Sequence, residues 1–207
     1  MRLHKVLCVA SLALLSACSF MQKKEEPKPL VKMKTELTAE EYAAWMADYE
    51  PKLTQAIAGT PLELTRNARS FMLTLPVDQA FNKDRPKMLM PAMLGPITKV
   101  TKLLESDAKT GVIILGHSDI SGNTALNAQL SQDRAKAVAA IFNLGGIRHD
   151  RLLLLGMGED KPRAGQATAA QRALNRRVEL IITPKGTLTN TLAQYRSAPY
   201  GVLAANK

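Results

Sequence analysis

An acidic loop and the polar face of the helix predicted after it are the part of this sequence best suited to chemistry. The loop, residues 116–122, contains Asp119 and directly follows a run of apolar residues. Asn127 and Arg134 are seven residues apart, so they share one face of a helix that turns by about 100° per residue. Arg176 precedes the last predicted strand and could close the same region. A carboxylate, an amide and guanidinium groups in this arrangement can line a groove that binds a small ligand.

Each of these residues also has a purely structural interpretation, and the sequence leaves both open. Asp119 could cap its own loop or the next helix, and Arg134 could be one half of an ion pair. His117 suggests a metal site, but no cluster of Cys, His and carboxylate residues surrounds it, so we expect a structural histidine. The sequence has no Ser/His/Asp arrangement, activated cysteine or phosphate-binding loop. We therefore expect a binding protein without a cofactor or metal, and not an enzyme.

Apolar patterns predict the elements that must hold these residues in place. Strands are predicted over residues 62–75, 111–115, 152–155 and 177–183, and helices over residues 88–104, 125–143 and 167–174. The regular alternation of strand and helix indicates an α/β domain with two layers and a mixed sheet. The tail, residues 185–207, has no strong period, and its role is open.

A helical lead-in is predicted ahead of this domain, over residues 38–60. Thr38 and Glu41 have the spacing of a capping box, and apolar side chains recur at helical spacing after them. Pro51 lacks a backbone donor, so we expect it to divide the segment into two short helices. The two expected helices are residues 39–49 and 51–58. Their apolar face could pack on its own domain or dock to a partner protein.

Several short motifs in the predicted domain resemble the OmpA-like peptidoglycan-binding family. They are Gly116-His117-Ser118-Asp119, Leu126-Asn127, Leu130-Ser131, Arg134-Ala135, Gly156-Met157-Gly158-Glu159 and Asn175-Arg176-Arg177-Val178-Glu179. The resemblance covers about residues 70–183 and implies an OmpA-like domain over residues 62–184. It implies a β-α-β-α-β-β core with a mixed sheet and helices on one face. It also implies noncovalent binding of peptidoglycan through the diaminopimelate of its stem peptide.

The chemistry of diaminopimelate agrees with the residues in these motifs. Its free end carries an ammonium beside a carboxylate, so a receptor needs an anion and a cation close together. Asp119 can accept from the ammonium, and Arg134 can bind the carboxylate with its forked guanidinium. The resemblance further implies roles for Asn127 and for Arg176 at the pocket edge. Asn82 stands where the family often has Asp, so it can hydrogen bond there but supplies no charge.

The first residues predict export and lipid attachment. Residues 1–17 have a charged start and an apolar run too short to span a bilayer, which is typical of a signal peptide. Leu15-Ser16-Ala17-Cys18 resembles a bacterial lipobox, the pattern cut just before a cysteine that becomes lipidated. Cys18 is therefore expected to carry the lipid, palmitate included. The alternative is a plain secretory signal cleaved near Ala17.

Two further features predict where the mature chain resides. In the lipoproteins that this start resembles, Asp after the cysteine favours the inner membrane, so Ser19 implies the outer membrane. Residues 18–37 are dominated by Lys, Glu and Pro, which predicts a mobile tether. The expected arrangement is a lipid anchor in the outer membrane and a domain in the periplasm.

The composition agrees with an envelope protein. The 207 residues include 28 Lys+Arg and 18 Asp+Glu, a formal net charge of +10, and are 46% hydrophobic, which is too apolar for a disordered chain. Anionic wall and membrane components account for the basic charge, and no aromatic-basic pattern for nucleic acid is present. We expect a lipoprotein that tethers the outer membrane to peptidoglycan. The alternative is a wall-anchoring subunit bound to other proteins in an envelope-spanning secretion or motility complex.

Overall fold

The computed structural model describes residues 37–200 of the chain. The predicted signal peptide, Cys18, residues 18–36 of the predicted tether and residues 201–207 of the tail lie outside the described residues. Residues 37–200 form a mixed α/β fold. In this part of the chain, no helix is both long enough and apolar enough to cross a membrane.

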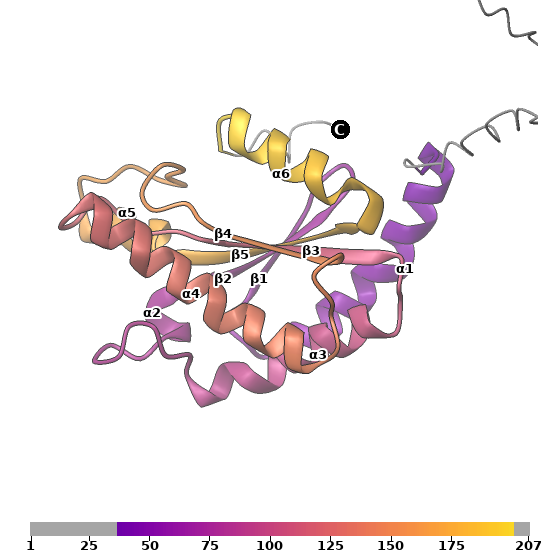
Figure 1. Ribbon diagram of the computed structural model, residues 1–207, viewed down its shortest axis with the longest axis horizontal. Coiled ribbons are helices and arrows are strands. Elements are labelled where there is room, and N and C mark those ends of the chain that lie inside the picture. The colour runs from indigo at the N-terminus through magenta and orange to yellow at the C-terminus, as the bar shows by residue number, and fades with distance from the viewer. Residues whose placement is uncertain (1–36, 201–207) are drawn as a thin grey trace, which may run out of the picture. The chain divides into compact units, whose positions relative to one another are not determined.

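A mixed sheet of five strands forms the centre of the fold (Figure 1). The strands are β1 (Glu63–Arg66), β2 (Phe71–Pro76), β3 (Thr110–Gly116), β4 (Leu152–Gly156) and β5 (Arg177–Pro184). They lie in the order β1-β2-β5-β3-β4, with β3 and β4 parallel and the other neighbours antiparallel. β3 and β5 are buried along their whole length, because side chains cover both faces of the sheet. This burial explains the continuous apolar run in each of them.

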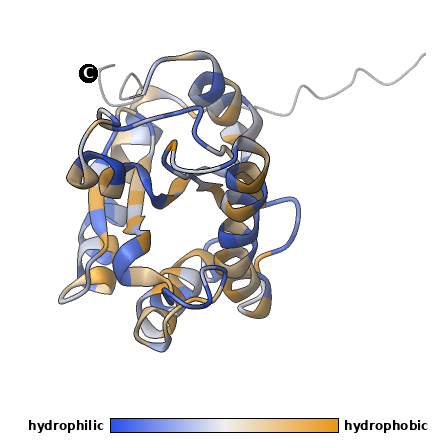
Figure 2. Cartoon of the chain, turned by 90° about the vertical axis from the view of Figure 1, so that its left-hand side faces the viewer, coloured by the Kyte–Doolittle hydropathy of each residue, from blue (hydrophilic) through white to orange (hydrophobic). Residues whose placement is uncertain are grey.

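Helices cover both faces of the sheet. They are α1 (Ala39–Ile57), α2 (Val77–Ala80), α3 (Pro91–Glu105), α4 (Thr124–Leu144), α5 (Ala169–Asn175) and α6 (Leu188–Ser197). α1, α3 and α4 pack on the face that carries Val112 and Ile114 and form the larger core with it. Polar and apolar residues alternate along the helices, as expected for helices with one face in a core (Figure 2). The mixed α/β fold is therefore confirmed.

Helix α6 lies on the opposite face, above the sheet in Figure 1, although the family resemblance implied helices on one face only. Leu188 and Tyr195 of α6 pack against Ile113 and Ile181, which alternate along their strands with residues of the larger core. A short 3₁₀ turn, Lys185–Thr187, leads into this helix. Few apolar residues of α6 are needed to cover the face, which explains why the tail has no strong period in the sequence.

Helix α1 runs through Pro51 without a break, so the prediction of two short helices is wrong. Its start has the predicted capping box. The Glu41 N–H donates to the Thr38 hydroxyl (3.2 Å), and the Thr38 N–H donates to the Glu41 carboxylate (2.7 Å). Tyr49 and Leu53, on either side of Pro51, are both buried in the domain core, and this packing holds the helix together despite the missing donor. The apolar face of α1 therefore packs on its own domain.

The single strand predicted over residues 62–75 is instead a hairpin of β1 and β2. The turn is closed by Asn67, whose backbone N–H donates to the Ser70 carbonyl oxygen (2.9 Å) and whose amide donates to the Ser70 hydroxyl (3.1 Å). Short polar side chains such as these favour turns because they bond to groups nearby in the chain. The other predicted strands and helices are confirmed, with ends shifted by at most three residues.

Helix α4 crosses two glycines that end neighbouring strands. Gly116 of β3 and Gly156 of β4 are register partners. A Cβ atom at Gly116 would lie 1.9 Å from the backbone oxygen of Ser131 in α4, and one at Gly156 would lie 2.6 Å from the backbone nitrogen of Gln132. The missing side chains let α4 approach the strand ends, and this contact sets the position of the polar face of α4.

We expect Gly116→Ala to lower the free energy of unfolding by about 1–3 kcal/mol, because backbone atoms of α4 must move to admit the methyl group. Urea unfolding measures the change. Gly95→Ala in α3 is the matched control, since a Cβ there meets nothing within 4 Å and alanine favours a helix. Equal stability of the two variants would contradict the close approach of α4.

Candidate functional site

Three segments meet at one end of the sheet, and two of them hold predicted site residues, Asp119 and Arg176. β2 and β3 end here and β5 begins here, since the register pairs Pro76 with Arg177 and Gly116 with Val178. The loop after β3, helix α2 after β2 and the residue before β5 therefore converge. We call this end of the sheet the site end.

Asp119 lies in the loop after β3 and is only 5% exposed. One oxygen of its carboxylate accepts a hydrogen bond from the Ser121 backbone N–H (2.9 Å). Asn127 of α4 donates through its amide to the backbone oxygens of Asp119 and Ser121 (3.1 and 3.0 Å) and to the Glu159 carboxylate (3.2 Å). Asn123 caps α4, so Asp119 is not used as the helix cap. Asn127 therefore fixes the loop that presents the Asp119 carboxylate.

Arg176 joins two carboxylates across the site. Its Nη1 donates to Asp119 Oδ2 at 2.6 Å, and its Nε and Nη2 donate to the two oxygens of Asp78 at 2.9 and 2.5 Å. The bidentate pair with Asp78 fixes the plane of the guanidinium. Asp78, in α2, is a site residue that sequence reasoning missed, because 98 residues separate it from Arg176. Only the pairing of β2 with β5 brings the two together.

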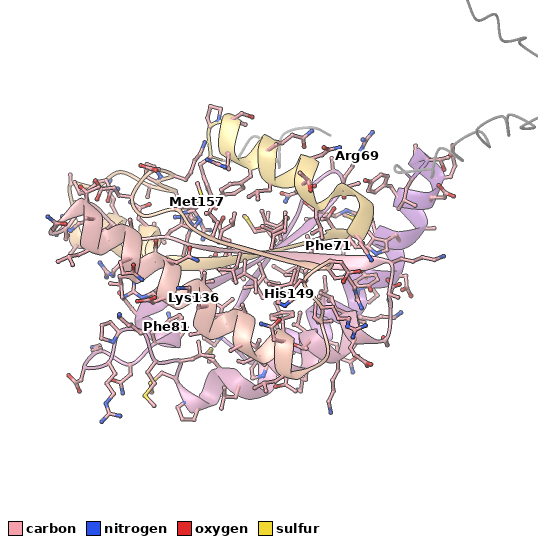
Figure 3. All side chains as sticks on the ribbon, in the orientation of Figure 1. Arg69, Phe71, Phe81, Lys136, His149 and Met157 are labelled. Atoms are coloured by element: carbon pink, nitrogen blue, oxygen red, sulfur yellow. The ribbon has the colours of Figure 1, made fainter. Side chains whose placement is uncertain are left out.

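Arg134 enters the same site from α4 and is 5% exposed. Its Nε donates to the Pro86 carbonyl oxygen (3.0 Å), and its guanidinium lies 5.8 Å from the centroid of the Phe81 ring, which Figure 3 labels. A guanidinium has five N–H groups, and no residue between 37 and 200 accepts a hydrogen bond from the remaining four. Within this range Arg134 also has no salt-bridge partner, so the interpretation as half of an ion pair is not supported.

The charges of these side chains act on one another. Burial alone would raise the pKa of the Asp119 carboxyl, but hydrogen bonds from Arg176 and Ser121 outweigh burial and hold that pKa below its usual range. Hydrogen bonds between Arg176 and Asp78 lower the pKa of Asp78 and raise that of Arg176. Burial and the charge of Arg176 lower the pKa of Arg134, and the two carboxylates oppose this. At neutral pH the site therefore holds two anions and two cations.

Asn82 follows Phe81 at the edge of the site. Its side-chain oxygen accepts hydrogen bonds from the backbone N–H groups of Asp84 and Arg85, both at 2.9 Å, and so closes a turn. A carboxylate could accept the same two bonds, so the amide retains this structural role. The turn supports the loop in which the Pro86 carbonyl oxygen accepts a hydrogen bond from Arg134 Nε. A direct contact of Asn82 with a ligand stays a prediction.

The structure thus brings four predicted residues together, and it gives them different roles. They are Asp119, Asn127, Arg134 and Arg176. Asn127 donates to backbone oxygens of the loop and to Glu159, and Arg176 holds Asp119 from one side. A carboxylate offers about four lone-pair positions, of which two at Asp119 are occupied by Ser121 and Arg176. Asp119 and Arg134 therefore keep acceptor and donor positions for a ligand that carries both a cation and an anion.

A second group of charged side chains lies beneath α6 and is separate from this site. We call His117, Arg177, Glu179 and Tyr195 the buried network. Arg177 Nε donates to Glu179 Oε1 (2.6 Å), the Tyr195 hydroxyl donates to Glu179 Oε2 (2.5 Å), and His117 Nε2 lies 3.1 Å from that hydroxyl. Among the residues that the structure describes, no three or more His, Cys, Asp or Glu side chains are placed to hold a metal ion. His117 here has a structural role.

Comparison with known sequences adds a family and two relatives. The sequence model of the OmpA family matches residues 88–176. "Probable lipoprotein YiaD" of Escherichia coli strain K12 is 34% identical over 140 residues, which cover 68% of this chain and 64% of that protein. "Peptidoglycan-binding protein ArfA" of Mycobacterium tuberculosis strain H37Rv is 35% identical over 103 residues, 50% of this chain and 31% of that protein. The chain therefore spans less than two thirds of either relative.

Comparison with solved structures agrees with the fold. A MotB-like protein from Desulfovibrio vulgaris superposes with a TM-score of 0.62 at 20% sequence identity, covering 70% of this chain and 98% of that one. A likeness at this level of identity shows that the two chains share a fold. The match to the OmpA family model contains Asp119 and Arg134 and ends at Arg176.

Proposed function

The chain carries a domain of the OmpA family, and from that premise we propose that it binds peptidoglycan noncovalently through the site end. The observation that carries the proposal is the pair Asp119 and Arg134. Both side chains are almost fully buried in one site, and both keep bonding positions that no described residue fills. The names of ArfA, a peptidoglycan-binding protein, and YiaD, a lipoprotein, support a role at the cell wall. The proposed role is binding and not catalysis.

Diaminopimelate is the part of the wall that suits this pair. Its free ammonium can donate to the two open positions of Asp119, while its carboxylate accepts from the free N–H groups of Arg134. Each charge-assisted hydrogen bond contributes about 1.5–3 kcal/mol net. Arg176 supports recognition indirectly, because it holds the Asp119 carboxylate in its ionised form.

A lipid at Cys18 would make the binding bivalent. Residues 19–36 can span at most roughly 60 Å when fully extended. Helix α1 begins at the end of the sheet opposite the site end, because Tyr42 in its first turns contacts Arg69 in the β1–β2 turn. The lipid would hold one end of the protein and the wall the other, so that the tether sets the effective concentration of the site near the wall. The proposed location is the outer membrane, with the domain in the periplasm.

The alternative, a subunit of an envelope-spanning machine, needs a surface for other proteins. The segments expected to serve that task are residues 38–58, most of which form helix α1, and the tail, residues 185–207. Its apolar side chains, among them Met46 and Leu53, are buried in the domain core and are not available to a partner. The burial of α1 therefore argues against docking through this helix, which supports the tether as the first proposal.

Sacculi of two kinds test the proposal. We expect the full chain to bind purified sacculi whose stem peptides contain diaminopimelate, and to bind at least ten-fold more weakly to sacculi with lysine at that position. Lysine keeps the ammonium and lacks the neighbouring carboxylate, so it leaves Arg134 without its partner. Co-sedimentation over a range of protein concentrations measures both affinities. Equal binding to the two kinds would contradict diaminopimelate as the ligand, and binding to neither would contradict the wall-binding function.

A further inference from the structure

A polar cavity of about 320 Å³ lies at the end of the sheet opposite the site end. Tyr42 of α1, Arg69 of the β1–β2 turn and one side of α6 line it. Figure 3 shows the separation, with Arg69 near α1 and α6 and Phe81 at the far side of the domain. The strand register agrees, since Phe71, next to this turn, pairs with Ile182 near the end of β5, whereas the site end holds the start of β5. The cavity is therefore distinct from the wall-binding site.

Arg69 is held in a way that leaves its hydrogen-bonding edge open. Its guanidinium carbon lies over the Tyr42 ring, 5.2 Å from the centroid, so the ring stabilises the cation. The Thr183 hydroxyl donates to the backbone carbonyl oxygen of Arg69 (3.3 Å), but no residue between 37 and 200 forms an ion pair or a hydrogen bond with the Arg69 guanidinium. A guanidinium in this position keeps its N–H groups for a ligand, in the fork that suits a phosphate or carboxylate.

The rest of the lining is neutral, and three of its side chains have free hydrogen-bonding groups. Asn190, Thr191 and Gln194 come from neighbouring turns of α6, and their side chains bond to no other residue in the described part of the chain. No acidic residue lines the cavity, so nothing there competes with an anion for Arg69. Amide and hydroxyl groups beside one cation suit a ligand that combines an anion with hydroxyl groups.

We propose that this cavity is a second binding site, for a glycerophosphate group. The phosphate pairs with the fork of Arg69, and the glycerol hydroxyls bond to Asn190, Thr191 and Gln194. The volume is sufficient, since about 320 Å³ corresponds to about ten water-sized groups at about 30 Å³ each. A glycerophosphate has a similar number of non-hydrogen atoms. This site goes beyond the proposed wall binding and does not depend on it.

Two sources can supply this chemistry, namely the headgroup of phosphatidylglycerol and free glycerol phosphate. The cavity lies where α1 begins, on the side of the domain that the tether would join to the membrane. A lipid headgroup on that side would orient the domain with its site end toward the wall. The choice of the lipid headgroup as the source rests on the proposed lipid anchor at Cys18, whereas the site itself does not.

Calorimetric titration of the full chain in detergent with glycerol 3-phosphate tests the site. We expect saturable binding that Arg69→Gln weakens at least ten-fold and Arg69→Lys restores in part, because lysine keeps the charge but not the fork. Inorganic phosphate should bind several-fold more weakly, because it cannot reach the amides of α6. Absence of saturable binding, or an unchanged affinity in Arg69→Gln at unchanged urea stability, would overturn the proposal.

Matched variants distinguish glycerol phosphate binding at this cavity from sacculus binding at the site end. Arg134→Gln should leave glycerol phosphate binding unchanged while weakening sacculus binding, and Arg69→Gln should do the reverse. Repeating the titration with the chain in phosphatidylcholine vesicles that contain phosphatidylglycerol or phosphatidylserine distinguishes the sources at equal surface charge. If glycerol 3-phosphate no longer binds in the vesicles with phosphatidylglycerol but still binds in those with phosphatidylserine, the site is assigned to the lipid headgroup. Equal binding of glycerol 3-phosphate in the two kinds of vesicle assigns the site to free glycerol phosphate. If phosphatidylglycerol also lowers the residual glycerol 3-phosphate binding of Arg69→Gln, the assignment to this cavity would be overturned.

Discussion

Replacing Asp119 and Arg134 together by alanine is expected to weaken sacculus binding by roughly 100-fold or more. The two side chains supply the anion and the cation of the site, and two charge-assisted bonds at about 1.5–3 kcal/mol each correspond to at least two powers of ten in affinity. Co-sedimentation of the double variant Asp119→Ala, Arg134→Ala with sacculi that contain diaminopimelate measures the loss. Undiminished binding would show that the ligand lies elsewhere.

The control for this variant removes the same charges from another place. Asp48 and Lys52 form an exposed pair, 2.6 Å apart, on the outer side of α1. The double variant Asp48→Ala, Lys52→Ala has the same net charge as the double variant of the site. We expect it to bind sacculi like the unmodified chain. Urea unfolding of all three proteins separates a lost contact from a lost fold, because removal of Asp119 also takes a partner from Arg176.

Glu179→Ala is expected to lower the free energy of unfolding by about 3–5 kcal/mol. Arg177 and Glu179 are 1% and 0% exposed, so the variant leaves a buried guanidinium without its carboxylate. It also removes the acceptor of the Tyr195 hydroxyl, which attaches α6 to the sheet. Urea unfolding measures the loss, and hydrogen exchange of the α6 amides shows whether that helix separates first.

Two comparison variants sharpen this result. Asp150→Ala breaks an exposed pair with Lys185, and we expect no measurable change in the free energy of unfolding, because solvent screens exposed pairs. Glu179→Gln keeps the shape of the side chain but removes its charge, so its stability should lie between those of the other two variants. If Glu179→Ala proved as stable as Asp150→Ala, the buried network would not be what holds α6.

The physical state of the buried network explains the expected size of the effect. Burial alone would raise the pKa of Glu179, but the hydrogen bond with His117 and the charge of Arg177 hold that pKa well below its usual range. Burial lowers the pKa of His117, so the imidazole is neutral at pH 7. The network therefore contains one buried anion and one buried cation, and removal of either leaves an uncompensated charge.

Several errors of sequence reasoning share one cause, which is that packing overrides a local signal. Pro51 is a strong local signal for a break, and the burial of Tyr49 and Leu53 on either side outweighs it. In α6, Leu188 and Tyr195 bury enough surface to hold a helix whose sequence has little period. These contacts join segments far apart in the chain, so no pattern within a short window of sequence could reveal them.

The sequence by itself determined the mixed α/β class, most of the helices and strands, and the shared face of Asn127 and Arg134. Those features follow from backbone periodicity, which is a local property. It also placed Asp119 near that face, because the loop of Asp119 leads directly into the helix. Only the tertiary structure decided that Arg176 reaches both Asp78 and Asp119, since the pairing of β2 with β5 brings distant residues together. The close contact of α4 with Gly116, the cover that α6 provides and the cavity beside Arg69 likewise depend on packing between distant segments.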